Sequence, residues 1–199
     1  MENNKEFTPE ESLQLISQVI ANTRNNIKHT SFFFLFWGWI MTFSSLTCFF
    51  LIRYFVGIHQ YDHINMACWI AWSVPTAIGI AVQIYYLQKL GKTTRVRSQL
   101  SAIIRTLWYA NFVALMIICY LCNRLNIYPT PLILVLTGLS TFLTGRIIDF
   151  KPLMYGGLVF AIAAILAVLV RGDYQLLIVA VAIVLGYLVP GYILKYGKA

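Results

Sequence analysis

Long apolar runs separated by short polar gaps make up the pattern along this chain of 199 residues. Six of the runs are about 19–22 residues long, the length that an α-helix needs to cross ~30 Å of hydrocarbon. The pattern predicts an all-α polytopic transmembrane helical bundle, because lipid offers backbone groups no hydrogen-bond partners outside the chain. The six spans of this transmembrane domain (31–199) are expected at about 31–52, 66–87, 102–122, 131–149, 152–170 and 174–194.

The first thirty residues differ from the rest and predict a cytoplasmic segment. They lack the short apolar core of a cleavable signal peptide, so the first span is expected to act as an uncleaved anchor. Thr8–Glu11 is typical of a helix start, with a capping threonine followed by proline, and predicts an amphipathic helix over about 9–29. Its apolar stripe has heptad-like spacing: Leu13, Ile16, Ile20 and Ile27.

Two interpretations of this helix are open. It either continues into the first span or folds back on the protein's own cytoplasmic face, or it presents its stripe to a protein partner or to a second copy of the chain. Two heptads are too few for a free-standing coiled coil.

Composition agrees with a membrane protein: 59% of residues are hydrophobic and 11% charged, against about 25% charged in soluble domains. The net charge of +8 is spread over the loops, so no nucleic-acid partner is expected. With the N-terminus inside, the outer side holds three of the 15 basic residues, Arg53, Arg124 and Arg171. The inner side holds the other twelve: Lys5, Arg24, Lys28, Lys89, Lys92, Arg95, Arg97, Arg105, Arg146, Lys151, Lys195 and Lys198. This asymmetry predicts cytoplasmic N- and C-termini.

Polar residues within the spans are few, and no carboxylate lies near the middle of one. A conventional proton relay therefore lacks its usual carrier, although a transporter that uses neutral groups stays open. The candidate pathway residues are Gln83, Asn111, Thr137 and Thr141. Thr137, Thr141 and Gly145 also form a stripe of small residues, whose alternative role is close packing of another helix.

Charged residues gather where the fourth and fifth spans meet. Asp149 can pair with Arg146 or Arg105, which would fix the depth of the helices at the inner interface. Alternatively, Arg105, Arg146 and Lys151 form a site for an anionic ligand.

Four cysteines suggest a redox alternative. Cys119 and Cys122 form a CxxC, and Cys48 and Cys68 also fall toward the outer ends of their spans. A membrane thiol oxidoreductase would use such thiols. The CxxC, however, is expected at a helix C-terminus, where the dipole disfavours thiolate, and buried cysteine commonly serves as a small apolar residue.

A possible metal site lies in the first outer loop, because His59 and His63 are four residues apart with Asp62 between them. On one helix face the two imidazoles can hold zinc. The metalloprotease pattern requires Glu after the first His, where Gln60 stands instead. With no phosphate loop and no nucleophile elbow in the sequence, we expect no enzymatic activity and no cofactor.

The segments that carry a family resemblance are Glu11–Ile16, Asn22–Asn26, Phe32–Trp39 and Gly145–Leu153. Together they resemble small multi-span membrane proteins of Bacteroidetes-type bacteria. The resemblance implies a bacterial inner (plasma) membrane location and carries no activity with it.

Two functions are therefore expected from the sequence. The first is a non-enzymatic membrane protein, in contact with membrane lipid, that self-associates as a homo-oligomer or docks a protein partner at its cytoplasmic face. The alternative is a small-solute transporter or channel that works as an oligomer, and thiol oxidoreduction is a third.

Overall fold

The computed structural model describes the backbone of residues 9–91, 99–170 and 172–196, and the side chains of 31–89, 102–170 and 172–196. Every regular element of secondary structure in these residues is a helix. The α-helices are α1 (Pro9–Gly57), α2 (Ile64–Gly91), α3 (Gln99–Leu125), α4 (Thr130–Ile147), α5 (Lys151–Leu169), α6 (Gln175–Ile183) and α7 (Val189–Tyr196). Short 3₁₀ turns form η1 (Tyr61–His63) and η2 (Gly172–Tyr174), and a π-helical segment, η3 (Val184–Leu188), joins α6 to α7.

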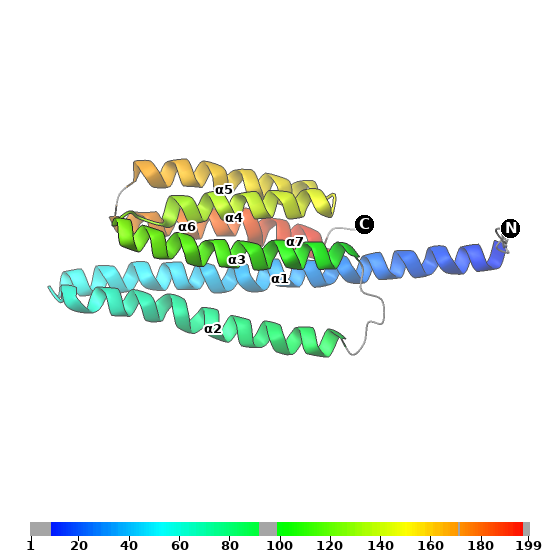
Figure 1. The fold of residues 1–199 in the computed structure, drawn as a ribbon, viewed down its shortest axis with the longest axis horizontal. Coiled ribbons are helices and arrows are strands. Elements are labelled where there is room, and N and C mark those ends of the chain that lie inside the picture. The colour runs from blue at the N-terminus through cyan, green and yellow to red at the C-terminus, as the bar shows by residue number, and fades with distance from the viewer. Residues whose placement is uncertain (1–8, 92–98, 171, 197–199) are drawn as a thin grey trace.

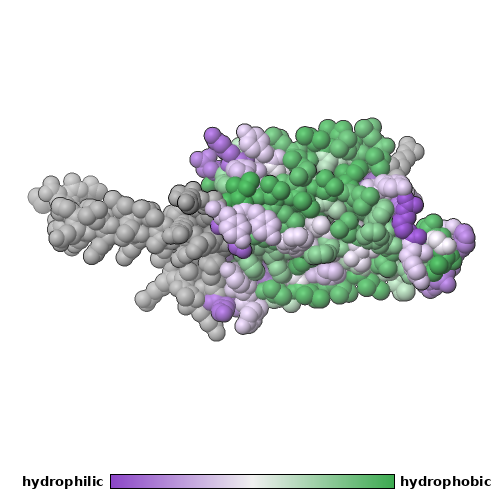
Figure 2. All heavy atoms as spheres, turned by 180° about the vertical axis from the view of Figure 1, so that it is seen from behind, coloured by the Kyte–Doolittle hydropathy of each residue, from purple (hydrophilic) through white to green (hydrophobic). Residues whose placement is uncertain are grey.

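Six segments within the described residues are long and apolar enough to cross a membrane, which confirms the predicted number. They are Ser31–Gly57, Tyr61–Lys89, Ala102–Leu125, Thr130–Ile147, Lys151–Leu169 and Gly172–Tyr196. Figure 2 shows the broad apolar band of the bundle, with polar residues gathered toward its two ends. The chain is a multi-span membrane protein.

Helix α1 is one uninterrupted helix of 49 residues. At 1.5 Å per residue it is ~74 Å long, more than twice the ~30 Å thickness of hydrocarbon. In Figure 1 its first part, in dark blue, extends past the ends of the other helices. The N-terminal amphipathic segment is thus a direct continuation of the first span, while the side chains of its stripe lie outside the described residues.

The core lies where α4, α5, α6 and η3 pack together against α1. The contact between α4 and α5 is the most extensive, and two glycines make it close. A Cβ on Gly138 would lie 2.8 Å from the Gly157 carbonyl oxygen, and one on Gly157 would lie 2.7 Å from that of Gly138. Only glycine allows the two backbones to approach this closely.

Helices α2 and α3 lie at the periphery. Helix α2 packs mainly on α1, and α3 packs mainly on α4. Many of their large apolar side chains are exposed, among them Trp69, Ile78, Val113 and Ile117. In a membrane protein these side chains face lipid, which is as apolar as they are.

The fourth span ends earlier than predicted. Helix α4 stops at Ile147, two residues before the expected Asp149. Asp149 has a φ of 51°, and Phe150 is extended, because the chain must reverse direction before α5 begins at Lys151. Pro152 lies in the first turn of α5, where a backbone N–H has no partner within the helix. Its missing N–H therefore costs the helix no hydrogen bond.

The sixth span changes from α-helix to a π-helical segment, η3, and back to α-helix. The π-helical segment η3 ends at Leu188, two residues before Pro190. The ring of Pro190 crowds the carbonyl four residues earlier, that of Gly186. Gly186 is also where η3 meets α5, since a Cβ there would overlap the Phe160 ring. We attribute the π-helical turn to these two constraints, both of which act at Gly186.

Candidate functional site

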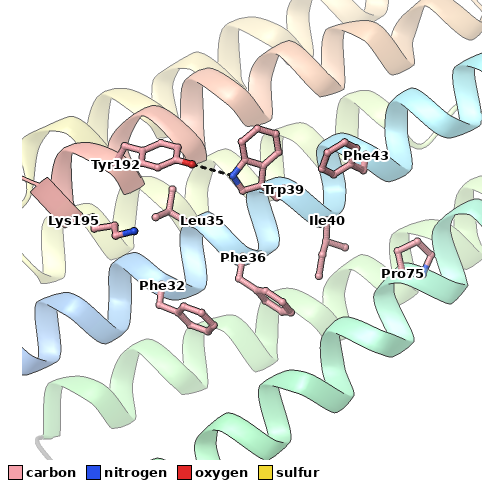
Figure 3. A pocket seen from close by; sticks show the side chains of 9 residues that line it. All are labelled: Phe32, Leu35, Phe36, Trp39, Ile40, Phe43, Pro75, Tyr192 and Lys195. Atoms are coloured by element: carbon pink, nitrogen blue, oxygen red, sulfur yellow. Dashed lines mark hydrogen bonds between the residues drawn. The ribbon is translucent and has the colours of Figure 1, made fainter.

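The pocket drawn in Figure 3 is an open groove along α1, between α2 and α7. Its volume is about 530 Å³. We call it the α1 groove, and nine side chains line it: Phe32, Leu35, Phe36, Trp39, Ile40, Phe43, Pro75, Tyr192 and Lys195. Six of the nine belong to α1, and their spacing of three and four residues places them on one face of that helix.

Most of the groove is apolar, and its polar groups lie near α7. Trp39 Nε1 donates a hydrogen bond to Tyr192 Oη at 3.2 Å. Phe32 stacks on Tyr86 of α2 with ring centroids 4.5 Å apart, which joins α1 to α2 beside the groove. Lys195 lies at the Phe32 end in Figure 3 and is the charged residue among the nine.

The length of the groove matches one leaflet of a bilayer. From Phe32 to Phe43 the α1 axis rises ~16 Å at 1.5 Å per residue. A single leaflet contributes about half of the ~30 Å of hydrocarbon. The arrangement suits an acyl chain whose anionic headgroup lies beside Lys195.

The predicted pathway residues are distributed over several helix contacts, and none of them lines the α1 groove. Gln83 accepts a hydrogen bond from Trp37 Nε1 at 2.8 Å, between α1 and α2. Asn111 Oδ1 accepts one from Ser140 Oγ at 2.8 Å, between α3 and α4.

The remaining two pathway candidates belong to the core of the bundle. Thr141 Oγ1 donates to the Thr137 carbonyl oxygen at 2.7 Å and lies 3.3 Å from Tyr187 Oη, between α4 and η3. The small-residue stripe continues at Gly145, where a Cβ would lie 2.7 Å from the Met154 backbone nitrogen of α5. The stripe therefore contacts η3 at Thr141 and α5 at Gly145.

Charges at the turn between α4 and α5 are exposed. Arg146 Nη1 lies 3.8 Å from Asp149 Oδ1, which confirms the predicted ion pair between these two residues. Both side chains are more than two-thirds exposed, so the pair adds little stability. Arg105 on α3 and Lys151 on α5 are exposed as well, and an anion site built on them stays a prediction.

The CxxC lies in the last two turns of α3, with Cys122 buried and Cys119 half-buried. The closest pair of thiols is a different one. Cys48 Sγ on α1 and Cys68 Sγ on α2 are 3.0 Å apart. The sequence predicted that both fall toward the outer ends of their spans, but their pairing depends on the register of α1 against α2, which no local pattern encodes.

The histidines between α1 and α2 do not share one helical turn. His59 has a φ of 58° and lies before η1, while His63 ends η1. His59 Nδ1 is 3.5 Å from Tyr61 Oη, and Asp62 is exposed. Across the residues with described side chains, no group of three His, Cys, Asp or Glu is placed to hold a metal ion.

Two contacts at the end of the bundle where α1 ends and α6 begins were not anticipated. Arg53 Nε lies 2.9 Å from Asp173 Oδ2, and its guanidinium carbon is 4.7 Å from the centre of the Tyr174 ring. Gln175 Nε2 donates to the carbonyl oxygens of Ala167 and Val170 at 2.8 and 2.9 Å, which satisfies acceptors at the end of α5. Both contacts hold η2 and the start of α6 in place.

Comparison with known protein families, with curated proteins and with solved structures gives no match for this chain. Its function has to be argued from the geometry above.

Proposed function

We propose that this protein is a non-enzymatic module of a bacterial inner membrane that acts by association at the cytoplasmic face, through the projecting part of α1. A second copy of the chain is the partner we infer first. The observation that carries the proposal is the continuity of α1 from Pro9 to Gly57.

The projecting part is stiff and long enough to reach a partner. Residues 9–30 rise ~33 Å along the helix axis at 1.5 Å per residue. An isolated helix of this length is marginal in water, so most of its stability has to come from packing of an apolar face. The stripe of Leu13, Ile16 and Ile20 is the face that the sequence provides.

A membrane favours pairing of this stripe with its own copy. Two copies inserted in the same orientation project their α1 helices on the same side, parallel and at the same height. The stripes then face each other about a two-fold axis normal to the membrane. Anchoring in the bilayer also raises the effective concentration, so two heptads can suffice where a free peptide would not associate.

The orientation in this proposal rests on charge. Twelve of the 15 basic residues fall on the side of the N-terminus when the six spans alternate, which is the positive-inside pattern of short loops. Arg53 and Asp173, which end the first span and begin the sixth, are ion-paired at the same end of the bundle, as alternation requires.

Transport is the weaker alternative. Gln83, Asn111 and Thr141 were its candidate pathway, and each is hydrogen bonded in a different helix contact. None of the three lines the α1 groove.

Association is tested by changing one face of the projecting helix and then the other. The double variant Ile16→Lys/Ile20→Lys puts two charges in the stripe and should abolish the dimer. The matched control Gln18→Lys/Asn22→Lys adds the same charges to the polar face and should leave the dimer intact. Oligomeric mass is measured by native mass spectrometry after release from lipid nanodiscs.

The possible outcomes distinguish a second copy of the chain from a different protein as the partner. A monomeric wild-type protein, or equal dimer content in both double variants, would contradict self-association through the stripe. If the wild-type protein is monomeric and a stoichiometric second protein is lost only from Ile16→Lys/Ile20→Lys, the partner is that protein and the stripe is its docking face.

A further inference from the structure

Cys48 and Cys68 occupy a contact between two helices that the proposed function does not use. Cys48 on α1 is 2% exposed, Cys68 on α2 is half-buried, and both are free thiols 3.0 Å apart at Sγ. A covalent disulfide has sulfurs ~2.05 Å apart, so an approach of about 1 Å would join them.

The pair belongs to a regular antiparallel contact along the two helices. Toward the outer end, the rings of Phe55 and His63 are 6.1 Å apart. Toward the other end, a Cβ on Gly79 would lie 3.0 Å from Ile40 Cδ1, and Trp37 donates to Gln83. The cysteines thus face each other because the register of the whole contact places them there.

Helix α2 is held in the bundle mainly by one neighbouring helix. It packs mainly on α1, and most of its remaining surface is exposed. Helices in lipid gain no hydrophobic driving force from packing on each other. A peripheral helix held mainly by one neighbour is therefore the element whose position a covalent bond would fix.

We propose that Cys48 and Cys68 form a disulfide that links α1 to α2 near the outer face of the membrane. The oxidant is an oxidised dithiol carrier of the compartment outside the membrane. The Cys68 thiolate, the more exposed of the two, attacks a carrier sulfur and releases one carrier thiolate. Cys48 Sγ then attacks Cys68 Sγ and releases the second. Both electrons and both thiol protons pass to the carrier, which leaves as a dithiol.

The cysteines at the end of α3 serve as the internal comparison. Cys119 and Cys122 lie on α3, which packs mainly on α4, so they belong to a different contact. Oxidising compartments maintain disulfides in general, and the prediction is specific for the Cys48–Cys68 pair.

The positions of the methionines allow the disulfide to be detected in the wild-type protein. The full chain is produced in a bacterial inner membrane, free thiols are blocked with N-ethylmaleimide before lysis, and the purified protein is cleaved with cyanogen bromide. Cleavage after Met41, Met66, Met116 and Met154 puts Cys48 in fragment 42–66, Cys68 in 67–116 and the CxxC in 117–154. We expect 42–66 and 67–116 to remain joined, two hydrogens lighter than their sum, and to separate on reduction.

Matched serine variants identify the bond. Cys68→Ser should release fragment 42–66 without reduction, whereas Cys119→Ser should leave the two fragments joined. Recovery of 42–66 and 67–116 as separate wild-type fragments, each carrying one maleimide, would overturn the proposal. So would a bond from either fragment to 117–154.

Discussion

At the scale of single residues, close backbone contact explains this fold better than polar chemistry. Gly138 and Gly157 each occupy the space that a Cβ on the other would need. Thr42, Thr141 and Thr144 each donate to the carbonyl oxygen four residues earlier in their own helix, at 2.7–2.8 Å. Without a hydrophobic driving force between helices, such tight contacts provide much of the packing energy of a membrane bundle.

Adding one methyl group at this contact should destabilise the bundle. In Gly157→Ala, the new Cβ would lie 2.7 Å from the backbone of Gly138 and Phe142, so α4 and α5 have to separate. Overpacking of this kind costs about 1–3 kcal/mol of unfolding free energy, measured by denaturant unfolding in mixed micelles.

The control for this variant is Gly57→Ala at the end of α1. A Cβ at Gly57 meets nothing within 4 Å, so this change should alter stability by less than ~0.5 kcal/mol. Equal stability of the two alanine variants would contradict the close approach of α4 and α5.

At the scale of elements, local sequence was sufficient for the helices but not for their contacts. Apolar run length placed all six spans, and Thr8–Glu11 indicated the start of α1, which begins at Pro9. The predicted pathway residues were found from their polarity alone, but their partners Trp37, Ser140 and Tyr187 come from other helices. The same limit hid the Cys48–Cys68 pair and the π-helical segment, both of which depend on tertiary register.

The α1 groove yields a prediction about lipid. If an anionic phospholipid lies in it with its headgroup at Lys195, then Lys195→Gln should reduce the anionic lipid that stays bound through purification several-fold, because the charge-assisted contact is lost. Bound lipid is measured by mass spectrometry against a fixed mixture of anionic and zwitterionic lipids.

Lys89→Gln is the matched control for this experiment. Lys89 is also exposed and lies in the last turn of α2, but it neither lines the α1 groove nor belongs to the predicted anion site. An equal loss of anionic lipid in both variants would show that general surface charge, and not the groove, retains it.

At the scale of the whole molecule, the helices differ in how much of their surface is buried against other helices. Helices α4, α5, α6 and η3 form the buried core with α1, while α2 and α3 are peripheral. Helix α1 belongs to both regions and continues beyond them (Figure 1). One helix therefore joins the core, the groove and the segment proposed to associate.

The alternation of six spans with both termini in the cytoplasm is the most direct point to measure, because the positions of the groove, the thiols and the projecting helix all depend on it. Alkaline phosphatase and green fluorescent protein are fused in turn after each inter-span position. Phosphatase activity is expected after Ile58, Asn126 and Gly172, and fluorescence after Thr94 and Phe150. Two successive positions reporting the same side of the membrane would contradict the six-span arrangement.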